Sequence, residues 1–133
     1  MRIGFLFNHY LSYQVLHGAP FAFELSRIRS DFQVELLFSN QNSYDEAKRI
    51  ARLYPDNRCT FKLLKQNSFT RFSSTIFPDL HRPLTLFANR KLLASFRALI
   101  APEKNYIILK ALPAFRNTSF IGLRHGAGDR PVS

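Results

Sequence analysis

The sequence predicts an α/β fold, a Rossmann-like three-layer sandwich built on a parallel sheet of about five strands. The order of the elements along the chain supports this prediction. Short apolar runs of strand length alternate with segments of helical periodicity, in the order β-α-β-α-β, a long irregular region, and then α-β-β. Parallel neighbours need crossover connections, and the crossover helices cover both faces of the sheet. Residues 1–133, of which 46% are hydrophobic, are therefore expected to form a single domain with a real core.

The first half of the chain supplies three of the expected strands. Residues 3–7 form a continuous apolar run, which is typical of a central strand covered on both faces. Residues 33–38 form the second strand. Residues 59–64 alternate at period two, which favours a third strand with one wetter face, nearer an edge.

The helix between the first two strands is expected to open at Pro20. Proline suits a first-turn position, because its missing N–H costs nothing there. Phe21, Leu25 and Ile28 follow at helical spacing and are the expected buried face.

The next helix shows a start and a stop signal. Ser43, with Glu46 three residues later, has the spacing of a capping box, and Pro55 ends the helix. The residues that share its apolar face are Ala47, Ile50, Ala51 and Tyr54.

The second half is expected to contain one helix and two strands. Residues 65–83 mix polar and aromatic residues and favour a long loop with a short helix, which forms either the rim of a site or a lip that binds a surface. Residues 84–100 regain helical periodicity before Pro102, and we prefer a core-facing helix to one on a membrane surface. The apolar positions on its face are Leu86, Leu92, Leu93, Phe96, Leu99 and Ile100. Residues 106–110 and 119–123 are the fourth and fifth strands.

The formal net charge of +10, from 19 Lys+Arg against 9 Asp+Glu, predicts attraction to polyanions or phosphorylated small molecules. The basic residues are spread along the chain, so a merely solvated basic surface stays an alternative. Cys59 is the only cysteine, which excludes a disulfide framework or a thiolate metal cluster and favours the cytoplasm. No G-x-G-x-x-G follows the first strand, and no apolar segment has the roughly 18 residues of a membrane span. We expect neither a metal nor a cofactor.

The densest group of functional side chains follows the fifth expected strand. Gly126 and Gly128 let the backbone turn sharply and approach a ligand. His125 can exchange a proton near neutral pH, and Asp129 can orient an imidazole or accept from a hydroxyl group. The alternative is an ordinary turn with a satisfied surface histidine.

Arginines at both ends of this segment, Arg124 and Arg130, can hold phosphate or carboxylate. Ligands in open parallel sheets bind outside the carboxyl ends of the strands. The loop after the first strand therefore shares the rim with this segment. Asn8, His9 and His17 belong to that region, and the two histidines compete with residue 125 for the role of base.

A basic Rossmann-like half that begins Met-Arg-Ile-Gly-Phe-Leu-Phe and reaches His-Gly-Ala-Gly-Asp-Arg resembles the N-terminal domain of a GT-B-type glycosyltransferase. The closest likeness is to the CDP-glycerol glycerophosphotransferase-like group, at motif level over residues 124–130. The resemblance implies two Rossmann domains facing a cleft, with acceptor on the first and nucleotide donor on the second. It implies that His125, in its His-Gly pair, is the base on the acceptor hydroxyl. The family pattern commonly continues to a lysine, where this chain has Asp129 and Arg130.

The implied function is that of the acceptor-side domain of a transferase in cell-envelope polymer synthesis. It would move a glycosyl or glycerophosphate group from a nucleotide-activated donor to a hydroxyl acceptor. The donor would bind a second domain beyond these 133 residues, so the chain alone is expected to be inactive. A lipid-linked acceptor would bring the protein to the inner face of the membrane as a peripheral protein. The alternative is a non-catalytic basic module for nucleic acid or an anionic membrane, although no nucleic-acid-binding motif is visible.

Overall fold

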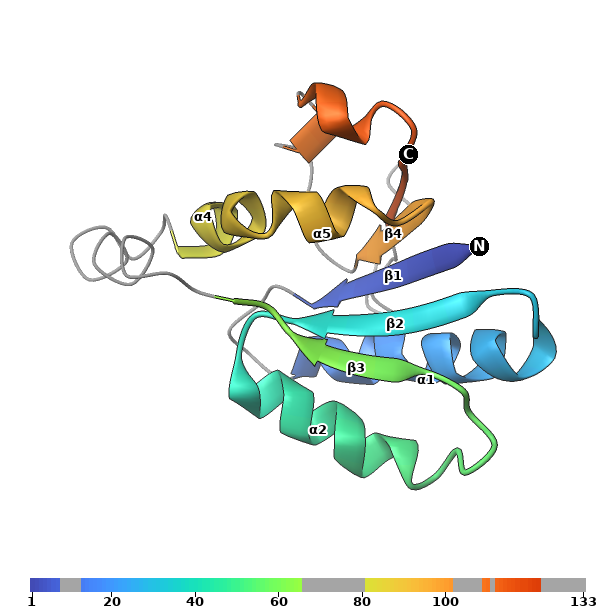
Figure 1. The fold of residues 1–133 in the computed structure, drawn as a ribbon. Helices are drawn as coiled ribbons and strands as arrows, with labels where there is room; N and C mark the ends of the chain where they lie inside the picture. Colours follow the sequence, from blue (N-terminus) through green and yellow to red (C-terminus); the bar gives the residue numbers. More distant parts are fainter. Residues whose placement is uncertain (8–12, 66–80, 102–108, 111, 123–133) are drawn as a thin grey trace, which may run out of the picture.

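The protein folds around one sheet of five parallel strands, in the order β3-β2-β1-β4-β5 (Figure 1). The computed structural model describes residues 1–7, 13–65, 81–101, 109–110 and 112–122. Helices α1 and α2 lie on one side of the sheet, and α4 and α5 lie on the other. The predicted fold class, a Rossmann-like α/β sandwich, is confirmed.

The central strand is β1 (Arg2–Phe7), as its apolar run predicted. It pairs in parallel with β2 (Gln33–Phe38) on one side and with β4 (Ala98–Ala101) on the other. At the two edges, β3 (Thr60–Leu63) pairs with β2, and β5 (Ser119–Gly122) pairs with β4. Every residue of β1 after the first is buried, because a strand covered on both faces needs apolar side chains on both. The predicted edge position of β3 is also confirmed.

One core lies between the sheet and the helices α1 (Tyr13–Ile28) and α2 (Gln41–Ala51). Aromatic rings dominate it. The ring of Phe7 stacks on that of Phe38, with centroids 5.2 Å apart. Rings of this size contribute much of the apolar area that stabilises a core, so these two strands are joined by packing as well as by backbone hydrogen bonds.

The second core lies under α4 (His81–Ala88), α5 (Arg90–Ala94) and the 3-10 turn η3 (Pro113–Phe115). Its side chains pack closely around Gly4 of β1. A Cβ atom on Gly4 would lie 2.9 Å from Cδ2 of Leu99, its register partner on β4. Any larger residue there must displace a packed side chain.

The prediction of one helix over residues 84–100 is wrong. Asn89 divides the segment into α4 and α5, and the last residues of the segment form β4. This strand is the fourth along the chain, the place that we expected residues 106–110 to take. All four residues of β4 are buried, and a short apolar run fits a buried strand or a helix equally well by periodicity alone. Within the expected strand, Leu109 and Lys110 lie in a 3-10 turn, and the rest is outside the described residues.

The face predicted for the first helix is wrong as well. Helix α1 begins at Tyr13, so Pro20 lies inside the helix and not in its first turn. Phe21 and Ile28 are 53% and 62% exposed, and only Leu25 packs partly against the core. Among the side chains of this helix that the structure describes, the buried positions are Val15, Gly18, Ala19, Ala22, Phe23 and Ser26. Small residues at helical spacing bring this helix close to the sheet, whereas the prediction took the largest apolar residues after the proline.

The N-cap of helix α2 lies three residues before the predicted cap, Ser43. Its N-cap is Asn40, whose Oδ1 accepts a hydrogen bond from the backbone N–H of Ser43 at 2.8 Å. That N–H is therefore not available to a capping box, and Glu46 forms an ion pair with Arg49 at 2.8 Å. Asparagine and serine are both favoured N-caps, so the sequence offered two starts. The buried apolar residues of this helix, as predicted, are Ala47 and Ile50.

Candidate functional site at the carboxyl edge of the sheet

The carboxyl ends of the strands form the edge at which open parallel sheets bind ligands. The strand order reverses between β1 and β4, which makes this pair the topological switch point. Phe5 is in register with Ile100 on β4, and Ile100 is in register with Ile121 on β5. The ends of β1 and β5 are therefore level within one residue, and two strand spacings put them about 10 Å apart.

The predicted site residues follow these strand ends along the chain. Asn8 and His9 come directly after β1 and lie outside the described residues. The residues expected after β5 also lie outside them: Arg124, His125, Gly126, Gly128, Asp129 and Arg130. His17 is in the second turn of α1, and of this residue only the backbone is described. The structure thus gives the points at which the two segments leave the sheet.

The exit of β1 is held by two groups of one residue, Ser39, which follows β2. The backbone N–H of Ser39 donates to the carbonyl oxygen of Phe7 at 3.2 Å, and the Ser39 hydroxyl lies 3.4 Å from the same oxygen. The next residue, Asn40, caps α2. The carbonyl group that precedes Asn8 therefore has a fixed position at the switch point.

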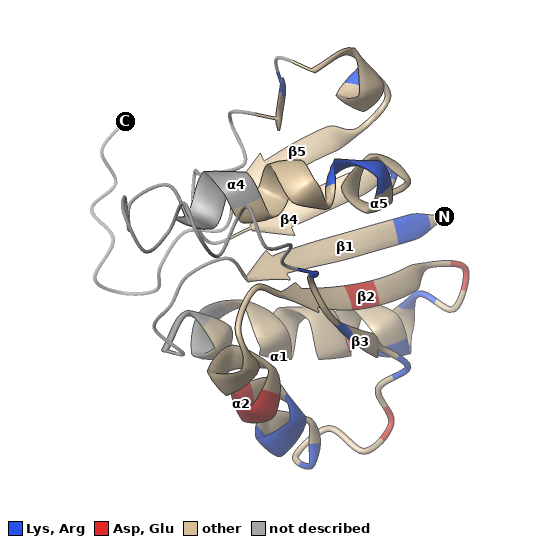
Figure 2. Cartoon of the chain, turned by 60° about the vertical axis from the view of Figure 1, so that its left-hand side comes forward, with Lys and Arg blue, Asp and Glu red and all other residues tan. Residues whose placement is uncertain are grey.

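A basic hollow of about 390 Å³ opens at the same edge, beside the end of β3 and the junction of α4 and α5. Its charged lining residues are Lys62, Lys65, Arg90 and Lys91. Lys62 is in register with Leu37, a member of the second core, so both side chains lie on the α4–α5 face of the sheet. Figure 2 shows the basic residues of β3 and α5. Among the described residues, no acidic side chain lines this hollow.

Sequence reasoning did not find the basic hollow. Arg90 and Lys91 fall outside the apolar face of the one helix expected over residues 84–100, and the third strand was expected only to have one wetter face. Nothing in the sequence joined two segments that are about 25 residues apart and meet only through the tertiary fold. The available signal was Asn89, because asparagine competes with helical hydrogen bonding and favours helix ends.

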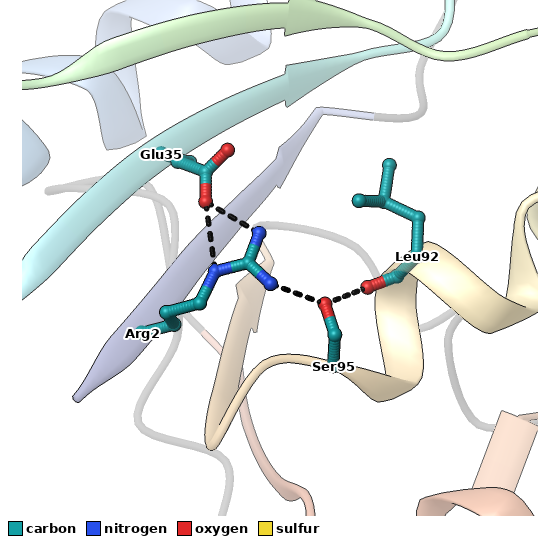
Figure 3. A network of polar contacts seen from close by, with 4 residues as sticks. All are labelled: Arg2, Glu35, Leu92 and Ser95. Carbon is teal, nitrogen blue, oxygen red and sulfur yellow. Dashed lines mark hydrogen bonds and ion pairs between the residues drawn. The ribbon is translucent and has the colours of Figure 1, made fainter.

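The amino edge carries a polar network that joins β1, β2 and the end of α5 (Figure 3). Arg2 donates from Nε and Nη2 to one oxygen of Glu35, at 3.2 and 2.7 Å, and from Nη1 to the hydroxyl of Ser95 at 2.6 Å. That hydroxyl donates to the carbonyl oxygen of Leu92. The guanidinium also lies 4.4 Å from the ring centre of Phe96. Because three of the five N–H groups of Arg2 are used by protein acceptors and its charge is paired with Glu35, this network has a structural role.

The one cysteine is poorly suited to nucleophilic chemistry. The thiol of Cys59 donates a hydrogen bond to the carbonyl oxygen of Ala22 at 3.3 Å. Burial raises the pKa of this thiol. Because the thiolate is the reactive form, a thiol held protonated reacts slowly.

No family model, curated protein or solved structure matches this chain. Within the part of the chain that the structure describes, no three His, Cys, Asp or Glu side chains are grouped so as to hold a metal ion. None of the described helices combines the length and the apolar character needed to cross a membrane. A functional assignment therefore depends on the carboxyl edge and on the residues that follow its strands.

Proposed function

We propose that this domain is the acceptor-side half of a transferase that moves a glycosyl or glycerophosphate group from a nucleotide-activated donor to a hydroxyl acceptor. The main support is the level exit of β1 and β5 on either side of β4, next to the switch point. Asn8 and His9 follow the first exit, and residues 124–130 follow the second. Two histidine-bearing segments thus start from one edge, about 10 Å apart, which is within the span of a small substrate.

In the proposed reaction, His125 is the general base. Its neutral imidazole takes the proton of the acceptor hydroxyl while the oxygen attacks the donor, and the nucleotide leaves with the bonding electrons. Asp129 orients the imidazole, and Arg124 and Arg130 hold phosphate. A positioned base of this kind contributes roughly 10²- to 10⁴-fold in rate.

The donor side of the reaction is assigned to a second domain. In this proposal the described sheet supplies the acceptor site alone, with an acceptor that is free or lipid-linked, so the 133-residue chain has no site for the nucleoside of an activated donor. Calorimetric titration of the chain with CDP-glycerol and with a nucleotide sugar is expected to show no binding tighter than that of inorganic pyrophosphate, which carries two phosphate groups without the nucleoside. Micromolar affinity for either compound that pyrophosphate does not share would contradict the acceptor-side assignment.

The catalytic assignment is tested in a protein that contains both domains. His125→Ala is expected to lower kcat by about 10²- to 10⁴-fold with little change in KM, because a base acts in the transition state. Arg130→Ala should mainly raise KM, because it removes ground-state binding. Alanine variants at His9 and His17 are the comparison, with thermal unfolding measured for each. Turnover that survives at position 125 but is lost at 9 or 17, without loss of stability, would assign the base to that other histidine.

The competing function is a non-catalytic basic module, and the same protein tests it. Such a module should bind duplex DNA or anionic vesicles tightly at low salt and lose that affinity steeply as salt is raised, through counterion release. The transferase proposal expects only weak, nonspecific binding in this titration. Tight, salt-sensitive binding together with normal turnover of every histidine variant would favour the module.

A further inference from the structure

The floor of the basic hollow is fixed by one buried amide. Asn89 lies between α4 and α5 and is only 7% exposed. Its Oδ1 accepts from the backbone N–H of Lys65 at 3.1 Å, and its Nδ2 donates to the carbonyl oxygens of Lys65 and Thr85, both at 2.8 Å. The amide therefore ties the chain just after β3 to the helix junction, and the backbone on both sides of the hollow keeps a fixed spacing.

Four cations surround this floor. Lys62 and Lys65 come from β3 and its exit, and Arg90 and Lys91 come from the start of α5. The ion pairs among the described residues use other cations. Arg90 donates from Nη1 to the carbonyl oxygen of Phe87 at 3.0 Å and lies 4.4 Å from the centre of its ring. The guanidinium is thus held in place by one of its five N–H groups, and most of its donors stay available to a ligand.

We propose that the basic hollow binds a small molecule that carries phosphate groups, such as a diphosphate or a phosphorylated sugar or alcohol. Lysine ammonium groups act as point charges on phosphate oxygens, and the arginine fork can take two oxygens at once. The cavity of about 390 Å³ falls within the roughly 300 to 1,000 Å³ of small-molecule sites. The site stands independently of the proposed transferase function, because it lies at the β3 end of the edge and its four cations are all described residues.

Inorganic pyrophosphate is the probe for this site. Calorimetric titration of the full chain at low salt is expected to show saturable binding. The double variant Lys62→Gln/Lys65→Gln should weaken that binding by about tenfold or more, and its thermal unfolding should stay close to that of the unchanged protein, because both side chains are exposed. The matched control, Arg52→Gln/Arg116→Gln, removes the same charge from exposed positions that do not line the hollow. With the comparison of the two double variants repeated at about 0.1 M salt, where the Debye length is about 10 Å, the control should keep affinity within about twofold of the unchanged protein, because its charges lie away from the hollow.

Equal losses in the two double variants would show that pyrophosphate responds only to net charge, and this would overturn the proposal. Absence of pyrophosphate binding at low salt would overturn it as well. Anionic phosphatidylglycerol vesicles and duplex DNA form two further arms of the experiment. If either binds through Lys62 and Lys65 while pyrophosphate does not, the surface recognises a membrane or a nucleic acid, and the small-molecule assignment is wrong.

Discussion

Replacing Asn89 by alanine measures how strongly the α4–α5 junction is tied to the sheet. The substitution removes three side-chain hydrogen bonds, but the carbonyl oxygen of Thr85 still accepts from the backbone N–H of residue 89 at 3.2 Å. Only the N–H and the carbonyl group of Lys65 lose their partner. Each such bond contributes about 0.5 to 1.5 kcal/mol, and an unsatisfied buried group costs about 1 to 3 kcal/mol. Because Lys65 is exposed, water offsets part of this cost, and we expect a loss of about 2 kcal/mol.

For a domain of this size, that loss corresponds to a fall in Tm of about 8 °C. Urea unfolding followed by circular dichroism gives the free energy directly, and Asn42→Ala is the matched control. Asn42 is exposed on α2, so its replacement should change stability by less than about 0.5 kcal/mol. If Asn89→Ala loses no more than this control, water replaces the amide fully, and the junction is not held as we argue.

Three further changes test other parts of the fold. Gly4→Ala should lower the free energy of unfolding by about 1 to 3 kcal/mol, because the new methyl group would lie 2.9 Å from Cδ2 of Leu99; unchanged urea stability would mean that the leucine moves freely. Burial raises the pKa of the Cys59 thiol in the folded protein. The protonated thiol therefore contributes its full stabilisation below the pKa of the unfolded chain, about 8.5, and this contribution is lost as pH rises through the higher pKa of the folded protein. The folded protein should therefore react slowly with a disulfide reagent at pH 8 and rapidly in urea, and fast labelling without urea would contradict this. Arg2→Met should destabilise the protein by about 1 to 3 kcal/mol, because it leaves Glu35 without its ion pair. The double variant Arg2→Met/Glu35→Gln should regain part of that loss in thermal unfolding. If it regains nothing, the loss comes from the packing of Arg2 on the ring of Phe96.

Four of the five strands were predicted correctly from two kinds of pattern. Apolar runs that stand alone between polar segments predicted residues 3–7, 33–38 and 119–123, which form β1, β2 and β5. Alternation at period two predicted residues 59–64, most of which form β3. The strand β4 was missed because its four residues follow a helix without a glycine or proline, so they extend the helical pattern by chance. Its strand conformation comes from pairing with β1 and β5 on both sides, and tertiary pairing of this kind overrides local propensity.

Helix faces were harder to predict than strands, because where a helix packs closely on a sheet its buried side chains are small and its large apolar side chains can be exposed. Ala19 and Ala22 are fully buried in α1, while Phe21 between them is half exposed. A helix that lies close to a sheet presents small residues to it, and a hydrophobicity pattern gives those little weight. The shared rim could be predicted from the topology, because parallel strands bring distant loops to one edge. The basic hollow could not be predicted, because its position depends on the register that pairs Lys62 with β2 and on the break between α4 and α5 at Asn89.

The two edges of the sheet differ in whether their basic side chains have acidic partners and in how closely those basic side chains are grouped. At the amino edge, Arg2, Arg27 and Arg29 each have a carboxylate within 2.9 Å, which offsets their charge locally. Arg52, Arg58 and Arg97 are exposed there without an ion pair among the described residues, but they belong to separate segments. The basic hollow, in contrast, gathers four cations around one cavity. Cations focused in a concave surface raise the local concentration of anions and their rate of association, and salt screens both effects. An anionic ligand would therefore be drawn toward the edge from which β1 and β5 exit, so its association rate should fall with salt more steeply than its dissociation rate changes.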